Sequence, residues 1–144
     1  RACDIVIAAD NANFIQSFCR LGLVPDSGGS WFLPRLAGHA RAMGMALLGD
    51  KVSAQQALAW GMIWQVVAAD QLAATSQTLA QHLATQPTYG LGLIKKALYS
   101  SANNTLDQQL DLERDLQRLG GRSDDYREGV SAFFAKRPPN FSGK

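Results

Sequence analysis

The chain has 144 residues, of which 47% are hydrophobic and 18% are charged, and its formal net charge is +2. This length and composition favour one folded domain with a buried core and exclude a disordered chain. The basic residues are scattered, which argues against nucleic-acid binding, and the longest apolar runs are far too short to span a membrane. Two cysteines, Cys3 and Cys19, make no disulfide framework, which favours a cytoplasmic location.

The first half predicts short strands around a glycine-rich turn. The apolar, partly β-branched residues 5–9 predict a buried strand, and residues 12–15 a second extended piece. The turn at residues 22–29 is followed by helix-like sequence. A helix over residues 39–48 is expected to end at Gly49, and the next helix to begin after Ser53 as N-cap and stop at Gly61. Residues 63–67 predict a last strand.

From Asp70 onward the sequence predicts only helices. Pro87 ends the first of them, a second covers residues 91–98, and a third ends at Gly120. The last helix begins after Ser123 as N-cap and ends before Pro138. The apolar stripes of the first and third helices are formed by Leu72, Leu79 and Leu83, and by Leu106, Leu110, Leu116 and Leu119.

These helical stripes have too little predicted sheet to pack against. We therefore expect them to need partners, either an N-terminal half or other subunits. The opening sequence RACDIVIAAD has no methionine and enters an apolar run almost at once. Since chain termini are usually polar and solvated, we expect the chain to be the C-terminal part of a longer protein.

Several familiar kinds of site are poorly supported. His39 and His82 lie far apart and show no ligand spacing with the cysteines, so no metal site is predicted. No nucleophile signature surrounds either cysteine. The segment GLGLIKK at residues 90–96 lacks the spacing and the Ser or Thr of a phosphate loop, and we interpret it as ordinary helix.

The last predicted helix carries two groups of polar or aromatic residues. Asp124, Asp125 and Glu128, with Arg127, are interpreted as a solvated first helical turn with local ion pairs. Phe133 and Phe134, with Lys136 and Arg137, are either core residues with a solvated basic end or a contact for an adenine ring and phosphates. The residues alone leave both interpretations open.

Asp26 is the single acid in the run GLVPDSGGSWFLPRLAG, residues 22–38. Its apolar neighbours predict a dry environment that raises the pKa of the carboxyl toward the range of a general base. Gly28 and Gly29 allow a tight backbone and the close approach of a ligand. The alternative is that Asp26 caps the following helix, with Ser27 and Ser30 as other candidates for the cap. The residues alone do not decide between the two.

Four blocks of the sequence together resemble the C-terminal half of the crotonase (enoyl-CoA hydratase/isomerase) superfamily. They are ACDIVIAADNANF, LGLVPDSGGSWFLPRLAG, ALLGDKVSAQQALAWGMIWQVV and YREGVSAFFAKRPPNF. The resemblance implies an α/β fold of ββα turns, followed by a helical region that builds trimers or hexamers. Residues 1–68 would then be the C-terminal part of the crotonase core, and residues 69–144 an oligomerising and CoA-contacting region.

The resemblance also implies an activity. Hydratases of the superfamily use two glutamates; the second falls on Phe18, which cannot carry a proton, and the first lies upstream of Cys3. The isomerase branch has a single acid after the proline of the LGLxP motif, and here that residue is Asp26. A lone acid suits moving a proton between carbons of a thioester enolate. Asp26 is therefore the expected catalytic residue, without a metal or separate cofactor, because CoA arrives with the substrate.

Among members of this superfamily, the amino-acid sequence of these blocks most resembles that of isomerases of phenylacetate degradation. This implies conversion of 1,2-epoxyphenylacetyl-CoA to oxepin-CoA, and of 3-enoyl- to 2-enoyl-CoA. A hydratase of the same superfamily is the alternative. The expected pocket residues are Phe18, Leu23, Pro25, Gly28, Gly29 and Trp31, and the expected CoA contacts are Phe133 and Lys136. The resemblance places the backbone donors of the oxyanion hole upstream of Arg1, so a non-catalytic fragment is a further alternative.

Overall fold

The computed structural model describes residues 3–144, which divide into two compact units, the first ending at Gln77 and the second covering Thr78–Lys144. Arg1 and Ala2, where the first of the four blocks begins, lie outside the described residues. Within the described part of the chain, no helix is long and apolar enough to cross a membrane. The predicted division at residues 68 and 69 assigns different functions to the two parts, and it stays a prediction.

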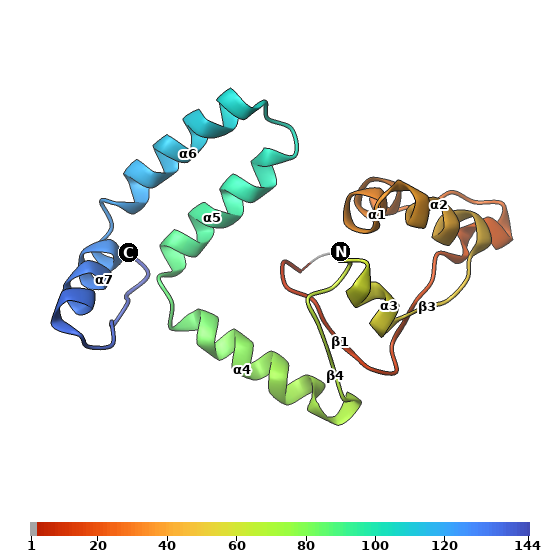
Figure 1. Cartoon of the computed structure of the whole chain (residues 1–144), viewed down its shortest axis with the longest axis horizontal. Coiled ribbons are helices and arrows are strands. Elements are labelled where there is room, and N and C mark those ends of the chain that lie inside the picture. Colours follow the sequence, from red (N-terminus) through yellow and green to blue (C-terminus); the bar gives the residue numbers. More distant parts are fainter. Residues whose placement is uncertain (1–2) are drawn as a thin grey trace. The chain divides into compact units, whose positions relative to one another are not determined.

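Two pairs of short strands organise the first unit. β1 (Ile7–Ala9) pairs in parallel with β4 (Gln65–Val67), and β2 (Asn13–Phe14) pairs antiparallel with β3 (Val52–Ser53) (Figure 1). The strands expected near residues 5–9, 12–15 and 63–67 are thus confirmed, though each is shorter. The sequence did not predict β3, because two residues are too few to show an alternating pattern.

The helices of the first unit lie between these strands. They are the 3₁₀ helix η1 (Ser17–Leu21) and the α-helices α1 (Gly29–Ala37), α2 (His39–Leu48) and α3 (Ala54–Ala59), with a second 3₁₀ turn, η2 (Ala69–Gln71), after β4. Gly49 ends α2 in the left-handed conformation, as expected. Ser53 is the N-cap of α3, as expected, and forms a capping box with Gln56.

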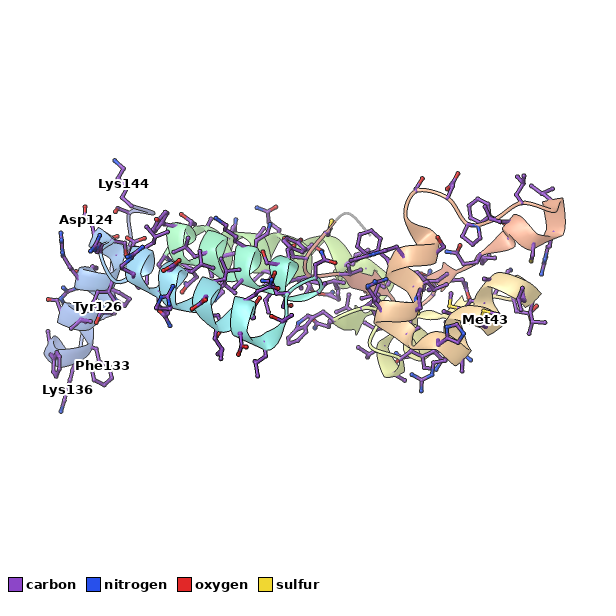
Figure 2. The ribbon with its side chains drawn as sticks, turned by 90° about the horizontal axis from the view of Figure 1, so that it is seen from above. Met43, Asp124, Tyr126, Phe133, Lys136 and Lys144 are labelled. Carbon is purple, nitrogen blue, oxygen red and sulfur yellow. The ribbon has the colours of Figure 1, made fainter. Side chains whose placement is uncertain are left out.

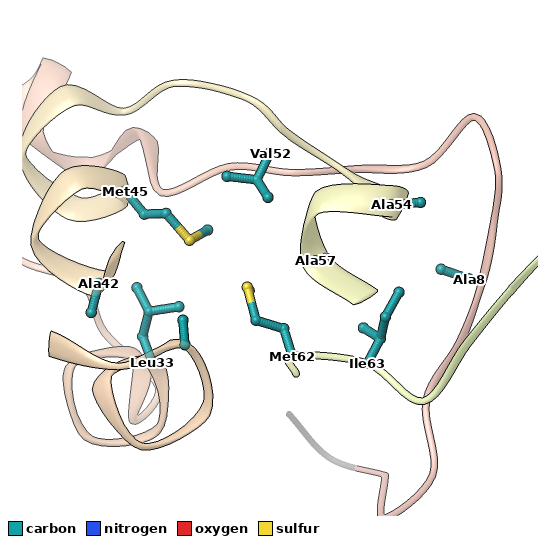
Figure 3. Close-up of a cluster of buried hydrophobic side chains, with 10 residues drawn as sticks. Ala8, Leu33, Ala42, Met45, Val52, Ala54, Ala57, Met62 and Ile63 are labelled. Carbon is teal, nitrogen blue, oxygen red and sulfur yellow. The ribbon is translucent and has the colours of Figure 1, made fainter. Parts of the chain in front are cut away.

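A cluster of small and medium-sized apolar side chains forms the core of this unit (Figure 3). Ala54 and Ala57 of α3 are completely buried, which lets that helix pack closely against the strands. The other buried members of the cluster are Ala8, Leu33, Ala37, Ala42, Met45, Val52, Met62 and Ile63. This core fixes the ends of the long segment that carries Asp26.

The second unit consists of helices followed by an extended C-terminal segment. α4 (Leu72–Ala84) crosses the boundary between the units, and α5 (Thr88–Ser101), α6 (Leu106–Gly120) and α7 (Asp124–Ala135) follow. Helices α5 and α6 run antiparallel, side by side (Figure 1). Thr105 caps α6 with a capping box, and Ser123 caps α7 as the sequence predicts.

Large apolar side chains remain exposed on these helices. Ile94 and Leu98 of α5 are 55% and 68% exposed, and Leu110 of α6 is 53% exposed. By contrast, Leu116 is buried. The predicted stripe of α6 is largely exposed, as expected, whereas Leu72, Leu79 and Leu83 of α4 are half-buried.

Replacing Met45 by Ala is expected to destabilise the first unit by about 2–5 kcal/mol, because its side chain is only 3% exposed in the core. Met43, on the same helix, is 44% exposed (Figure 2) and provides the matched control. Urea unfolding of Met45→Ala and Met43→Ala measures the difference. Equal shifts of the two midpoints would contradict this description of the core.

Candidate functional site

Asp26 lies in a tight turn between η1 and α1, residues 22–28, called here the Asp26 turn. The turn begins at Gly22, which has a left-handed backbone with φ of 69°, and the Leu23 N–H donates to the carbonyl of Phe18 at 3.0 Å. The turn closes where the Gly29 N–H donates to the carbonyl of Asp26 at 2.7 Å. The backbone around Asp26 is therefore held by hydrogen bonds on both sides.

The Asp26 turn ends in two consecutive left-handed residues, Ser27 with φ of 50° and Gly28 with φ of 79°. A non-glycine residue in this region costs about 1 kcal/mol, so the turn stores backbone strain at Ser27. Strain of this kind persists only where the surrounding structure imposes it. The position of Asp26 is thus specified by the fold.

The structure rules out the helix-cap alternative. The N-cap of α1 is Gly28, and no side chain caps it. The predicted candidates for the cap, Asp26, Ser27 and Ser30, were therefore wrong. The reason is the backbone, because a capping side chain needs an extended conformation at the N-cap, and Gly28 is left-handed. Within the described residues, the Asp26 carboxylate makes no hydrogen bond or ion pair.

The predicted dry environment of Asp26 is also wrong for this chain. Asp26 is exposed, and its apolar neighbours Leu23 and Trp31 are 59% and 42% exposed. Apolar neighbours in sequence do not enclose a side chain when the turn carries them to the surface. Any enclosure of Asp26 would need surfaces that these residues do not supply.

The predicted pocket residues lie on one continuous connection. Phe18 is in η1, Leu23 and Pro25 are in the Asp26 turn, and Trp31 is in the first turn of α1. Gly28 and Gly29 join the Asp26 turn to α1, and a Cβ atom on Gly28 would lie 3.1 Å from the Phe32 ring. These residues are neighbours along one stretch of the chain, and their role as a pocket stays a prediction.

Two further residues contact this connection, and the sequence analysis missed both. The guanidinium of Arg35 lies 3.8 Å from the Trp31 ring and donates to the Trp31 carbonyl at 2.9 Å, so it fixes that ring. Their i, i+4 spacing on a helix was the available signal. The buried Gln16 Oε1 has no partner and lies 3.7 Å from where a Gly29 Cβ would be. No sequence signal distinguishes Gln16.

The predicted CoA contacts, Phe133 and Lys136, lie together at the C-terminal end of α7 (Figure 2). Phe133 is 80% exposed, and its ring meets that of Phe134 edge to face, 5.8 Å between centroids. Both rings line a groove of about 800 Å³ formed by α5, α6, α7 and Phe141. Lys136 ends the helix in the left-handed conformation, with φ of 50°.

The acidic cluster of α7 differs from the solvated turn that the sequence predicts. Asp124 pairs with Arg127 at 3.0 Å on the surface, as expected. Asp125, however, is only 3% exposed, and its carboxylate accepts the backbone N–H groups of Ser142 and Gly143 at 2.6 and 2.9 Å. The solvated interpretation of Asp125 was wrong because the C-terminal segment folds back over it.

Glu128 holds the same C-terminal segment. Its two carboxylate oxygens accept from Arg137 at 2.6 and 2.8 Å, and Oε1 also accepts the Asn140 N–H at 2.8 Å. The hydrogen bonds from Arg137, followed by that from Asn140, lower the pKa of the Glu128 carboxyl from 4.5 to about 2. Glu128 is therefore ionised and paired throughout the physiological pH range.

The structure also places the residues considered for metal or phosphate binding. His39 and His82 are both exposed, and no group of three possible ligands occurs among residues 3–144. Residues 90–96 lie inside α5, as expected for ordinary helix.

Comparison with known proteins gives one consistent result. Residues 1–144 match the profile of the Enoyl-CoA hydratase/isomerase family. The chain is 69% identical over 141 residues to 1,2-epoxyphenylacetyl-CoA isomerase of Escherichia coli, covering 98% of this chain and 54% of that enzyme. It is 36% identical over 142 residues to 2,3-dehydroadipyl-CoA hydratase of the same organism, covering 99% of this chain and 56% of the relative.

A solved structure agrees with these relatives. The crystal structure of an enoyl-CoA hydratase from Polaromonas sp. JS666 superimposes with a TM-score of 0.93 at 35% identity, covering 98% of this chain and 55% of that one. The chain thus spans about half the length of the curated relatives it matches.

Gly28→Ala is expected to destabilise the first unit more than Gly22→Ala. Both residues have positive φ, so either alanine costs about 1 kcal/mol of backbone strain. Only at Gly28 does the added methyl group also press on Phe32, whereas nothing lies within 4 Å at Gly22. Thermal unfolding and near-ultraviolet circular dichroism measure the two effects. Identical changes in both variants would contradict the contact between Gly28 and Phe32.

The contribution of Glu128 to stability is expected to depend on pH only in acid. Since its pKa is lower in the folded chain than when unfolded, the stabilisation is complete above pH 4.5 and is lost as the pH falls toward about 2. Carboxyl ¹³C shifts in NMR follow the titration. In Arg137→Met the Glu128 midpoint is expected to move back toward 4.5, and an unchanged midpoint would contradict the pairing.

Proposed function

On the premise that the chain belongs to the enoyl-CoA hydratase/isomerase (crotonase) family, whose profile it matches over residues 1–144, we propose that the intact protein is an acyl-CoA isomerase. The fold class expected from the sequence is confirmed by solved structures of this family that superimpose with TM-scores of 0.96 and 0.95. The observation that carries the proposal is that the Asp26 carboxylate is exposed and makes no hydrogen bond or ion pair among the described residues.

Asp26 has the properties of a proton carrier. Its carboxylate is exposed and has no partner among the described residues, while a hydrogen-bonded turn fixes its backbone. A carboxylate that is neither capping a helix nor paired with a cation keeps its lone pairs for substrate. In the proposed reaction Asp26 removes a proton from the carbon α to the thioester of a 3-enoyl-CoA, and the electrons move to the thioester oxygen. The same proton is then returned to the γ carbon, giving the 2-enoyl-CoA.

The substrate proposal follows the E. coli isomerase relative. Its name states that it acts on 1,2-epoxyphenylacetyl-CoA, and we propose the same substrate for the intact protein, with oxepin-CoA as product. Phe18, Leu23, Pro25, Gly28, Gly29 and Trp31 are the proposed pocket residues. The aromatic pair of Trp31 and Phe32, with centroids 4.8 Å apart, offers rings to an aromatic acyl group.

The proposed CoA contacts are Phe133 and Lys136. An exposed aromatic ring suits stacking on adenine, and an ammonium suits the phosphates. Lys136 makes no ion pair among the described residues, whereas its neighbour Arg137 is paired with Glu128. Lys136 is therefore the cation still available to a ligand at this end of α7.

Assembly, cofactor use and location complete the proposal. The exposed apolar side chains of α5 and α6 support a homotrimer or hexamer built through the helical region. No separate cofactor is proposed, because the reaction is a proton transfer and CoA arrives with the substrate. The cysteine content supports a cytoplasmic location.

A hydratase is the second candidate, favoured by the likeness to 2,3-dehydroadipyl-CoA hydratase. A hydratase needs a second acid to activate water, and the position expected for it carries Phe18, whose ring has no ionisable group. Water addition to a 2-enoyl-CoA by the intact protein would favour this candidate.

Asp26→Asn is expected to lower kcat for the isomerisation of a 3-enoyl-CoA by about 10²–10⁴-fold in the intact protein. Exchange of deuterium into the α carbon should fall with it, because both need the same proton carrier. The thermal midpoint should not fall, since the Asp26 side chain makes no bond that the substitution breaks. The assay follows absorbance of the conjugated thioester and exchange by NMR.

The matched control is Asp70→Asn, another exposed aspartate of the first unit, which lies in η2. It should turn over and exchange at the rate of the unaltered protein. Unchanged turnover and exchange in Asp26→Asn would contradict the assignment of Asp26 as the proton carrier. Loss of hydration with normal isomerisation would favour the second candidate.

A further inference from the structure

The C-terminal segment, residues 138–144, runs back along α7 from its end to its start. The Asp125 N–H donates to the carbonyl of Lys144 at 3.1 Å, so the last residue of the chain lies beside the first turn of the helix. Figure 2 accordingly shows Asp124 and Lys144 together at one end of α7, and Phe133 and Lys136 at the other. The segment forms neither helix nor strand.

The C-terminal segment has little slack. Twelve helical residues rise by about 18 Å, and seven extended residues span at most about 23–25 Å. An extended segment has no hydrogen bonds of its own, so groups outside it must hold it in place. The structure places two carboxylates for this purpose, Asp125 and Glu128, three residues apart on α7.

Asp125 holds the far end of the segment. Its Oδ1 accepts the Ser142 N–H and lies 3.3 Å from the Ser142 hydroxyl, and its Oδ2 accepts the Gly143 N–H. A buried carboxylate with three donors is fully satisfied, and it lies in the first turn of α7, where the helix dipole favours a negative charge. Removing the acceptor would leave those N–H groups without a partner.

Glu128 holds the near end, next to Lys136. Its two-pronged bond to Arg137 fixes the residue that directly follows Lys136. The Lys136 and Arg137 N–H groups in turn donate to the carbonyls of Phe133 and Ala132 at 3.2 and 3.1 Å, which closes the helix end. Lys136 therefore lies between a helix end closed by backbone bonds and a residue, Arg137, whose side chain Glu128 holds.

Lys136 occupies a backbone position that usually holds glycine. Its φ of 50° and ψ of 41° are left-handed, which costs about 1 kcal/mol for a residue with a side chain. Glycine or asparagine would end the helix at lower cost. Strain retained at one residue points to a use for its side chain. Here that side chain is an ammonium with no ion pair among residues 3–144, and it follows the helix end that carries the exposed Phe133 ring.

We propose that Asp125 and Glu128 are positioning residues for CoA recognition, because they fasten residues 138–144 to α7 and so hold Lys136, beside Phe133, toward the adenosine end of CoA. This inference rests on the proposed function in one respect, the assignment of Phe133 and Lys136 as CoA contacts. Neither carboxylate touches the ligand. Their effect is on the affinity for the nucleotide end of CoA and not on proton transfer.

The test compares coenzyme A with pantetheine, which lacks the adenosine end. Dissociation constants are measured by calorimetry on the intact protein, so the result does not require isomerase activity. Lys136→Ala is expected to weaken CoA binding about tenfold, as for loss of one charged contact. Glu128→Gln and Asp125→Asn are expected to weaken it about three- to tenfold. None of the three should change the affinity for pantetheine.

The matched control is Asp124→Asn, which removes a neighbouring carboxylate whose partner is Arg127 on the surface. It should leave both affinities unchanged. Hydrogen exchange followed by mass spectrometry measures how firmly residues 138–144 are attached to α7. These residues should exchange faster in Glu128→Gln than in the control. If Asp125→Asn folds poorly, Glu128→Gln alone carries the test.

Three outcomes overturn the inference. The first is faster exchange of residues 138–144 with unchanged discrimination between CoA and pantetheine. The second is an effect of Lys136→Ala without any effect of Glu128→Gln. The third is an unaffected CoA affinity in Lys136→Ala. That outcome would also contradict the assignment of Lys136 as a CoA contact, but it would not affect the proposed role of Asp26 in isomerisation. Failure of Asp26→Asn to lower turnover, with the binding results as expected, removes the isomerase proposal alone.

Discussion

The parallel pairing of β1 with β4 is the constraint on which the first unit depends. Three residues near the start of the unit pair with three near its end, and the segment between them contains η1, the Asp26 turn and α1 to α3. Closing so long a loop costs entropy that two short strands do not recover from hydrogen bonds alone. The apolar cluster supplies the rest, with Ala8 from β1 and Ile63 just before β4 (Figure 3).

Because the strands close this loop, the backbone of Asp26 is held in place, whereas its side chain is exposed. Arg20 at the end of η1 donates to the carbonyl of Gly49 at 3.0 Å, which ties the start of the Asp26 turn to the end of α2. At its other end the turn continues into α1, whose Leu33 and Ala37 are in the core. The carboxylate between these anchors is exposed, an arrangement that suits a group that must meet a substrate.

The second unit is held by different forces. Few of its side chains are buried, and among them is the carboxylate of Asp125. Hydrogen bonds to Asp125 and Glu128 fix the C-terminal segment, and its Phe141 lines the groove between the helices. In this unit, hydrogen bonds attach the C-terminal segment to α7, while α5 and α6 present an exposed apolar surface. The proposed CoA contacts lie at the C-terminal end of α7, and the proposed assembly uses that surface.

The sequence by itself determined the helices, their caps at Ser53 and Ser123, the strands β1 and β4, and the family, because these depend on local spacing and on motifs. It also singled out Asp26. Only the tertiary structure decided what surrounds each acid. Asp26 proved exposed and Asp125 buried, the reverse of the expectation from their neighbours in sequence, because burial depends on which distant segments fold over a residue. For Asp125 that segment is the C-terminus, and no local pattern predicts that it returns along α7.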